Sequence, residues 1–464
     1  MNECPISRRK FVKASLAAGA ALATGPIQNL SAGNAKSKPN ILLIFSDQQH
    51  WHAMGFLGSF FHTPHLDALA RESVVFENSF CTTPQCSPSR SSLLTGFYPT
   101  KTGVMGNVGA AGGERLMQET LASELTSSGY RTGYFGKWHL GDRQIATKGW
   151  DRSNLKINDR SAESDAVAFL RQSARSTTPF ALFVSFNNPH DIYRFERHRM
   201  EPADKRVALP PSWDSETLKD KPSVQRQFML EDQGKVIWGK DRKVWEQYRD
   251  CYRTKTRLYD SNVGAVLDEL KKQGLWDNTV VIVTSDHGDM DTNHKLIYKG
   301  PFMYEHMVRI PLMIRVPAQF GREGARRITD LDVVNVDIAP TIRDICGLSP
   351  VTCDGISLAP TLTGSKKQRT RDFVIGQYYS KQKWVNPIRM IRTHAFKFNR
   401  YIRHGEELYD LRDDPHELKN LANDRKFANV KSKLSRKLDR WIEENNDPFY
   451  SLDTTTRSGK TIYP

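Results

Sequence analysis

Four apolar runs of strand length lie before residue 290, and a group of polar residues follows each of them. The runs occupy residues 40–45, 130–135, 180–186 and 279–284, and helical patterns separate them at 116–128, 162–173 and 248–273. Runs that are apolar throughout are typical of central strands covered on both faces. Strands that alternate with helices predict an α/β fold built on a doubly wound, mixed sheet, with ligands beyond the carboxyl ends of the strands. We therefore expect the polar groups at one edge of this sheet.

Two further segments complete the large domain. Another strand is expected at 309–315 and a helix at 336–346. Residues 191–245 are polar, rich in charge and aromatic side chains, and only weakly periodic. Segments of this kind run over the surface and often shape binding sites, so we predict a long surface excursion near the active edge.

A polar, basic stretch at 363–371 predicts a domain boundary, which assigns 36–370 to the large α/β domain and 371–464 to a smaller one. Short strand-like runs follow at 373–375, 388–392, 395–401 and 407–410. The last helix carries apolar residues at three- and four-residue steps, namely Phe427, Val430, Leu434, Leu438, Trp441 and Ile442. One apolar stripe packs a helix onto a core, so the pattern predicts an α+β subdomain with a short antiparallel sheet and a helix.

The N-terminus has the order of an export signal. Arg8, Arg9 and Lys10 precede an Ala/Leu-rich run at 14–23, and small residues follow. This order is similar to a twin-arginine signal at 1–35, and the run is too short to cross a membrane. A buried helix is the alternative interpretation. The signal predicts an exported protein, periplasmic or extracellular, that does not span the membrane.

The net charge of the chain is +15, from 67 Lys and Arg against 52 Asp and Glu. Residues 1–35 contribute four cations and one anion, so the remainder carries 15 − 3 = +12. A basic exported protein suits polyanionic ligands, although charge also serves solubility. No zinc-finger spacing and no recognisable nucleic-acid module accompanies the charge, which favours an acidic glycan over nucleic acid as partner.

Candidate chemistry centres on Cys86-Ser87-Pro88-Ser89-Arg90. Proline is tolerated in the first turn of a helix, and the residues after it continue well as helix. Cys86 is therefore expected at a helix N-terminus, where backbone N–H groups and the helix dipole favour negative charge, and Arg90 adds a cation one turn later. An ordinary small cysteine at a helix start is the alternative.

Cys-x-Pro-x-Arg, followed here by Ser92-Leu93-Leu94-Thr95-Gly96, resembles the type I sulfatase motif of the alkaline phosphatase superfamily. The resemblance runs from about residue 38 to about 450 and includes Leu408-Tyr409-Asp410-Leu411 of the smaller domain. It implies that a formylglycine-generating enzyme oxidises Cys86 to Cα-formylglycine (3-oxoalanine). The hydrated aldehyde of that residue is the nucleophile in the family, and its second hydroxyl can collapse and expel sulfate, which a serine ester could not do.

The resemblance also implies a site for one divalent cation. Asp47 and Asp286 follow two predicted strands, and Gln48, His287 and the modified Cys86 complete the expected ligands. Hard oxygen ligands suit Ca²⁺, with Mg²⁺ as the second choice. Two positions depart from the family pattern, because Gln48 stands where relatives often have Asp and His287 where many have Asn. Each aspartate taken alone could instead cap a helix.

Four further residues are expected to bind the anion. Lys137 and His139 resemble the Lys-x-His pair beside the formylglycine, and His190 and Lys299 resemble the pair that contacts the sulfate and the leaving oxygen. His190 is the first candidate for the proton donor and His139 the second. Elsewhere, Cys346 and Cys353 are close enough in sequence for a disulfide, although buried thiols are equally compatible.

The leading hypothesis is a sulfatase that acts on an acidic sulfated polysaccharide or oligosaccharide. Additional cations are expected to bind neighbouring acidic groups of that substrate, both in 193–199 and from the smaller domain, namely Arg389, Arg392, Lys397, Arg400 and Arg403. The alternatives are a phosphonate monoester hydrolase or phosphodiesterase of the same superfamily and a non-catalytic protein that binds sulfated glycans.

Overall fold

A computed structural model describes residues 38–141, 148–197, 207–321, 324–365 and 367–461. The predicted export signal at 1–35 lies outside these residues. Residues 39–464 group as one compact unit. Within the described part of the chain, we find no helix with the length and apolar character needed to span a lipid bilayer.

The unit is built on an eight-stranded mixed sheet, ordered β5-β4-β6-β1-β7-β8-β2-β9. Its central strands are the four predicted ones, β4 (Arg131–Gly136), β6 (Phe180–Pro189), β1 (Asn40–Asp47) and β7 (Thr279–Ser285), and they run parallel. The antiparallel strand β8 (Leu312–Arg315) and the short strands β2 (Val74–Phe76), β5 (Arg152–Asn154) and β9 (Arg326–Ile328) complete the sheet. Every residue of β1 is buried, which explains its unbroken apolar run. The α/β prediction is confirmed.

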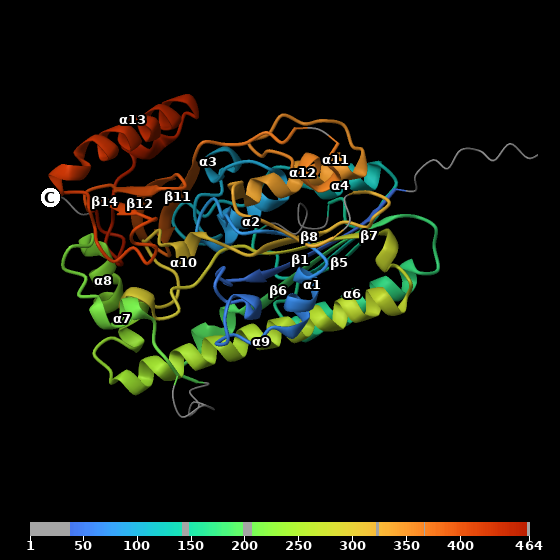
Figure 1. Cartoon of the computed structure of the whole chain (residues 1–464), viewed down its shortest axis with the longest axis horizontal. Coiled ribbons are helices and arrows are strands. Elements are labelled where there is room, and N and C mark those ends of the chain that lie inside the picture. Colours follow the sequence, from blue (N-terminus) through green and yellow to red (C-terminus); the bar gives the residue numbers. More distant parts are fainter. Residues whose placement is uncertain (1–37, 142–147, 198–206, 322–323, 366, 462–464) are drawn as a thin grey trace, which may run out of the picture. The chain divides into compact units, whose positions relative to one another are not determined.

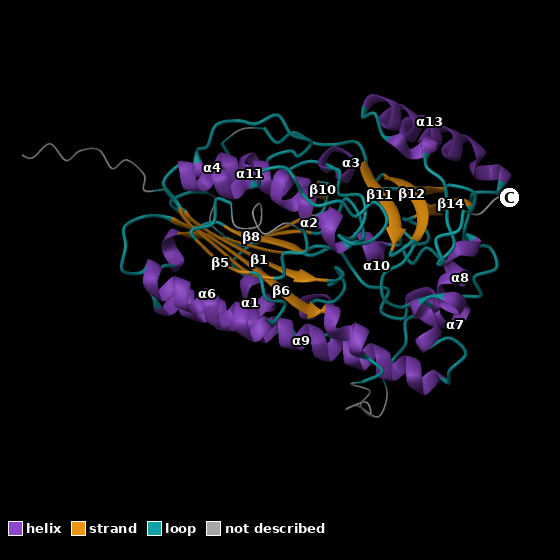
Figure 2. Ribbon diagram, turned by 180° about the vertical axis from the view of Figure 1, so that it is seen from behind, coloured by secondary structure: helices purple, strands orange, loops and turns teal. Residues whose placement is uncertain are grey.

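Helices cover both faces of this sheet (Figures 1 and 2). One face packs on α1 (Pro64–Ala70), α6 (Asp159–Ser173) and the long α9 (Arg242–Lys272). The other face packs on α2 (Cys86–Thr95), α4 (Leu121–Ser127), α11 (Ile338–Cys346) and α12 (Ala359–Thr363). The left-handed conformation of Gly96, with φ 87°, ends α2. The sheet is thus covered on both faces, and α2 presents its first residue, Cys86, at the carboxyl ends of the strands.

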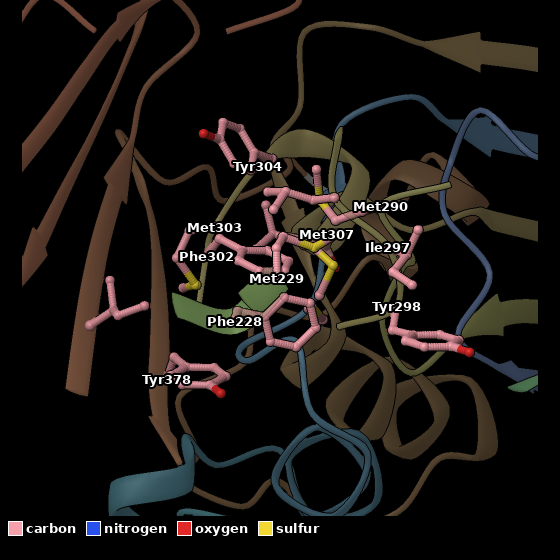
Figure 3. Packing of buried hydrophobic residues seen from close by; sticks show 14 of the residues in the cluster. Phe228, Met229, Met290, Ile297, Tyr298, Phe302, Met303, Tyr304, Met307 and Tyr378 are labelled. Carbon is pink, nitrogen blue, oxygen red and sulfur yellow. The ribbon is translucent and has the colours of Figure 1, made fainter. Parts of the chain in front are cut away.

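The C-terminal part forms the predicted antiparallel sheet with one helix. Its strands are β11 (Val374–Lys381), β12 (Trp384–Arg392), β13 (Phe396–Tyr401) and β14 (Gly405–Asp410), and α13 (Ala428–Glu444) packs on one face. The other face enters a core with Phe302, Met303 and Tyr304, as Figure 3 shows for Met303 and Tyr378. The β11–β12 hairpin is much longer than the sequence indicated. The boundary near residue 370 stays a prediction.

The predicted surface excursion at 191–245 is wrong for the described residues after 206. This segment folds into α7 (Pro211–Ser215), α8 (Ser223–Glu231) and the start of α9. Phe228 and Met229 are buried in the same core as Tyr304 and Met307 (Figure 3), and Trp245 belongs to this core as well. The sequence pattern did not indicate these buried residues, because polar residues surround them and the helices are too short to show a clear hydrophobic period.

The remaining elements are short. They are η1 (Gly55–Leu57), β3 (Ser79–Phe80), α3 (Pro99–Thr102), η2 (His190–Arg194), η3 (Gln233–Val236), η4 (Trp276–Asn278), η5 (Asn293–Lys295), α10 (Glu305–Val308), β10 (Val333–Val334), η6 (Asn335–Asp337), η7 (Arg425–Phe427) and η8 (Pro448–Ser451). The described cysteines are thiols, so the structure favours the thiol alternative for Cys346 and Cys353.

Candidate active site

The polar groups that follow the central strands meet at one edge of the sheet, around Cys86. Asp47 is the last residue of β1, Lys137 and His139 follow β4, and His190 follows β6. Asp286 and His287 follow β7. The carboxyl ends of parallel strands share an edge, so residues that are up to 240 positions apart become neighbours here.

Cys86 is fully buried at the start of α2 and is surrounded by cations. Lys299 Nζ donates to its Sγ at 2.7 Å, His287 Nε2 lies 3.3 Å from the sulfur and Lys137 Nζ lies 3.9 Å from it. Burial by itself would raise the pKa of the Cys86 thiol, but Lys137, Lys299 and His287 together hold this pKa well below its ordinary value. The surroundings therefore stabilise negative charge at this position.

Arg90 links the two aspartates beneath the nucleophile. Its Nε donates to Asp286 Oδ2 at 2.8 Å, its Nη2 to Asp47 Oδ2 at 3.0 Å, and its Nη1 to the Lys137 carbonyl at 2.6 Å. The same Nη1 also donates to Ser185 Oγ at 2.7 Å. With 1% of its surface exposed, Arg90 contacts protein groups on every side. It positions the carboxylates rather than reaching into open solvent.

The donors expected for a metal ion lie together. Asp47, Cys86, Asp286 and His287 each offer a ligand atom within 4.8 Å of the others. Burial and repulsion from Asp47 raise the pKa of Asp286 to about 6, which marks an excess of carboxylate charge at that side chain. Two carboxylates with further oxygens suit a hard divalent cation, and the donor set fits Ca²⁺. Lys137, whose Nζ is 2.7 Å from Asp47 Oδ2, shares one of the same carboxylates.

Gln48 lies beside this group in a left-handed conformation, with φ 79°. Its backbone N–H donates to Asp286 Oδ1 at 3.0 Å, and its Nε2 donates to Asp289 Oδ2 at 2.6 Å. Among the described residues, its buried Oε1 has no hydrogen-bond partner. A buried amide oxygen without a partner fits a metal ligand, which would compensate its desolvation. Asp289, which orients this amide, was missed by the sequence reasoning, although it stands in the same polar group as Asp286.

The two predicted histidines of the anion site differ in their surroundings. His139 is half-buried, has φ 59°, and its Nδ1 lacks a hydrogen-bond partner in the described chain. Burial and repulsion from Lys137 lower the pKa of His190 to about 4. The His190 imidazole is therefore neutral at pH 7 before a substrate anion binds.

The pocket beside Cys86 has a volume of about 400 Å³. The predicted residues Lys137, His139, His190 and Lys299 line it, and so do Tyr193 and Arg194.

Two lining residues from the β11–β12 hairpin, Lys381 and Gln382, were not predicted. Lys381 Nζ donates to the Lys299 carbonyl and lies 5.7 Å from the Tyr193 ring centre. Burial and the nearby Lys299 lower the pKa of Lys381 to about 7. The sequence showed Lys381 only as a lysine between two predicted strands, which did not indicate a place in the pocket.

None of the five cations expected from the smaller domain lines the pocket beside Cys86. All five form ion pairs with other residues: Arg389 pairs with Asp447, Arg392 with Glu305, Lys397 with Glu305 and Glu417, Arg400 with Glu406 and Asp439, and Arg403 with Asp453. Arg389 and Lys397 are completely buried. For these two buried cations the expected substrate contact is wrong, and for the other three it stays a prediction. Of the expected cations in 193–199, Arg194 lines the pocket, whereas His198 and Arg199 lie outside the described residues.

Comparisons with known proteins agree with this geometry. The sulfatase family model matches residues 39–348, and a model described as N-sulphoglucosamine sulphohydrolase, C-terminal, matches 293–444. A Delta 4,5-hexuronate-2-O-sulfatase from Bacteroides thetaiotaomicron is 29% identical, covering 94% of this chain and 96% of its own. A solved 2-O GAG sulfatase aligns with a TM-score of 0.80 at 27% identity, covering 90% of this chain and 95% of that one. A phosphonate monoester hydrolase from Agrobacterium radiobacter shares the fold. It aligns with a TM-score of 0.72 at 23% identity, covering 92% of this chain and 100% of that one.

The mixed α/β sheet and the cysteine-centred site define a hydrolase of the alkaline phosphatase superfamily. Within it, the chain belongs to the formylglycine-dependent sulfatase family and is a sulfuric ester hydrolase.

Proposed function

We propose that this enzyme removes sulfate esters from an acidic sulfated polysaccharide or oligosaccharide, with formylglycine at position 86 as the nucleophile. The observation that carries the proposal is the position of Cys86, buried among Lys137, Lys299 and His287 at the head of α2. The relatives described as a hexuronate 2-O-sulfatase and a 2-O GAG sulfatase support the carbohydrate class.

In the proposed reaction, one hydroxyl of the hydrated aldehyde gives its proton to the Asp286 carboxylate and attacks sulfur, and the S–O bond to the sugar breaks. The sugar oxygen takes a proton from His190, or from His139 if that residue is closer to the leaving oxygen. The second hydroxyl then gives its proton to the histidine that has just donated one, the carbonyl forms again and sulfate leaves by C–O cleavage. Water restores the hydrate. Lys137 and Lys299 stabilise the anionic oxygens, because preorganised cations act strongly in a buried site.

The proton donor needs a raised pKa when substrate is bound. His190 has a pKa of about 4 in the free enzyme. A sulfate anion between Lys137 and Lys299 would neutralise the repulsion that lowers this pKa, so substrate binding itself favours the protonated imidazole. His190 would therefore carry its proton mainly when a sulfate ester occupies the pocket.

The metal is part of the proposal. Asp47, Asp286, Gln48 and the modified residue 86 would hold Ca²⁺, with His287 as a further ligand. A bound divalent cation would polarise sulfate and stabilise an alkoxide. The unpartnered Oε1 of Gln48 and the clustered carboxylates support this ligand set. Mg²⁺ is the second choice, because its strict octahedral geometry suits so crowded a protein cage less well.

Substrate binding involves cations beyond the nucleophile. Lys381 and Arg194 line the pocket but do not contact Cys86, so they are available to a uronate carboxylate or a second sulfate. Charge-assisted hydrogen bonds are worth about 1.5–3 kcal/mol each, which favours an acidic oligosaccharide over a small aryl sulfate by orders of magnitude in kcat/KM.

Desulfation of defined oligosaccharides tests the assignment. We expect kcat/KM for at least one acidic sulfated oligosaccharide to exceed that for an aryl sulfate, and the difference to shrink with added salt because exposed charges are screened. Equal turnover of aryl sulfate and every oligosaccharide, at low and high salt, would refute the carbohydrate proposal. Faster turnover of an aryl phosphonate would favour the phosphonate hydrolase alternative, for which the comparisons supply only a shared fold. Absence of all turnover would favour the binding protein.

The cellular context completes the proposal. We infer export by the twin-arginine signal at 1–35 and conversion of Cys86 by a formylglycine-generating enzyme. Fractionation of the native host, with and without substitution of Arg8 and Arg9 by lysine, tests the export. Loss of the protein from the periplasm or medium only in the variant is the expected result.

A further inference from the structure

A second pocket, of about 520 Å³, shares none of its lining residues with the pocket beside Cys86. Four histidines line it: His416, and a group of three made up of His50, His52 and His306. His50 and His52 follow β1, and His306 lies in α10. The sequence reasoning gave these residues no role, because His306 lies more than 250 positions after His50 and His52.

The three imidazoles form a compact group. Each offers a ring nitrogen within 4.8 Å of the other two. Their ring centres lie 4.9 Å apart for His52 and His306, 5.3 Å for His50 and His306, and 6.1 Å for His50 and His52. Small side-chain rotations would bring three nitrogens to the distances of about 2.0–2.1 Å from a common centre that zinc requires.

The buried side chain of His50 lacks hydrogen-bond partners. Its surface is 1% exposed, yet neither ring nitrogen has a hydrogen-bond partner among the described residues. The nearest carboxylate is that of Asp291, whose Oδ2 lies 3.6 Å from His50 Nε2. Asp291 is also buried, and its Oδ1 lacks a hydrogen-bond partner in the described chain. Buried polar groups without partners are costly, and a bound ligand would compensate both residues.

The donors of electron pairs in this pocket are less engaged by the protein than its arginines are. The pocket also contains arginines, but Arg249 Nε lies 3.3 Å from Asp291 Oδ2 and Arg392 Nε lies 3.1 Å from Glu305 Oε1. Arg309 Nε donates to the Glu77 carbonyl at 2.7 Å. These guanidinium groups are engaged by the fold. The histidines and the free oxygen of Asp291 remain as donors of electron pairs.

We propose that His50, His52 and His306, with Asp291 as the fourth ligand, bind a second metal ion of the Zn²⁺ class. Three imidazoles and one carboxylate suit zinc and do not suit Ca²⁺, which takes oxygen ligands. The ion would join the segments that follow β1 and β7 to α10. It would also support Gln48, because the His50 ring stacks on Tyr252 at 5.3 Å and the Tyr252 hydroxyl donates to the Gln48 carbonyl at 2.7 Å.

Zinc binding to the full-length enzyme tests the proposal. The Cys86→Ala/Asp286→Ala background removes the thiol and one carboxylate of the group around position 86, which weakens zinc binding there. After chelation and dialysis, calorimetric titration with ZnCl₂ should show about one site per chain, and thermal unfolding should shift upward by a few degrees. His52→Ala and His306→Ala should each weaken binding at least about tenfold, whereas the exposed His62→Ala should bind as the parent does.

Two outcomes would overturn the proposal. One is the absence of stoichiometric zinc binding by the parent. The other is equal affinity in the parent and in both histidine variants. If a variant folds poorly, Co²⁺ titration of the parent decides the question, because a tetrahedral site gives strong visible absorption and its absence refutes this ligand set. Restoring Asp286 to this background should leave the zinc affinity of the histidine site unchanged, which separates this site from the proposed Ca²⁺ site.

Discussion

Lys299 Nζ donates to Cys86 Sγ at 2.7 Å and lies 3.0 Å from His287 Nε2, so one ammonium group contacts both Cys86 and His287. Lys299→Met keeps the length of the side chain and removes its charge. We expect kcat to fall by about 10²–10³, because one preorganised donor to the reacting anion is lost. Steady-state kinetics measure this loss. Lys295→Met, which removes a nearby lysine that contacts the Glu216 carbonyl instead, should change kcat little.

Conversion of Cys86 changes the mass of its peptide. Replacement of a thiol by an aldehyde lowers the mass by roughly 18 Da, and mass spectrometry of the active enzyme should detect this form. Cys86→Ala and Cys86→Ser should each abolish multiple turnover. Active enzyme that contains only the thiol at position 86 would contradict the proposed nucleophile.

Loss of Arg90 should cost stability as well as activity. Arg90→Met leaves Asp47 and Asp286 buried without their shared partner, and breaking a buried ion pair in this way costs about 3–5 kcal/mol. Denaturant unfolding, followed by tryptophan fluorescence, measures the change. As the matched control, Arg171→Met removes an exposed arginine paired with Glu269 and should change the stability little, because solvent screens exposed ion pairs. Similar costs for the two variants would show that Arg90 does not hold the site together.

Removal of the proposed Ca²⁺ should abolish activity. We expect exhaustive chelation to stop turnover and added Ca²⁺ to restore it, because the carboxylate ligands Asp47 and Asp286 would lose their common cation. Asp286→Ala should show low activity that added Ca²⁺ does not restore. Metal analysis after chelation must show an empty site. Full activity in that state would count against the proposed metal.

Lys381 predicts a pH dependence of substrate binding. Its pKa in the fold is about 7, depressed from 10.5 by burial, so the side chain is charged below pH 7 and loses its proton as the pH rises through that value. If the ammonium binds an acidic group of the substrate, KM should rise between about pH 6 and 8. Lys381→Arg, which stays charged, should keep a low KM at pH 8. Lys381→Met should have a high KM that does not change over this range. If Lys381→Met kept the rise of KM with pH that the parent enzyme shows, the contact would be refuted.

The sequence was sufficient for features that depend on local pattern. Apolar runs identified β1, β4, β6 and β7, because a strand buried on both faces needs apolar side chains throughout. The position of Asp47, Lys137 and Asp286 directly after such strands then determined which edge they share, since parallel strands end on the same side. Pro88 and Gly96 likewise indicated where α2 begins and ends.

Only the tertiary structure decided which cations line the pocket beside Cys86. Arg389 and Lys397 could not be distinguished by sequence from Lys381, because each is a cation within a short strand or its turn. Their partners are distant in the chain: Asp447 lies 58 residues after Arg389, and Glu305 lies far before Lys397. The same holds for His50 and His306, whose proximity is created by the packing of α10 against the segment after β1. A charge reveals its role only when its spatial neighbours are known, because Coulomb interactions and desolvation depend on distance and burial and not on sequence separation.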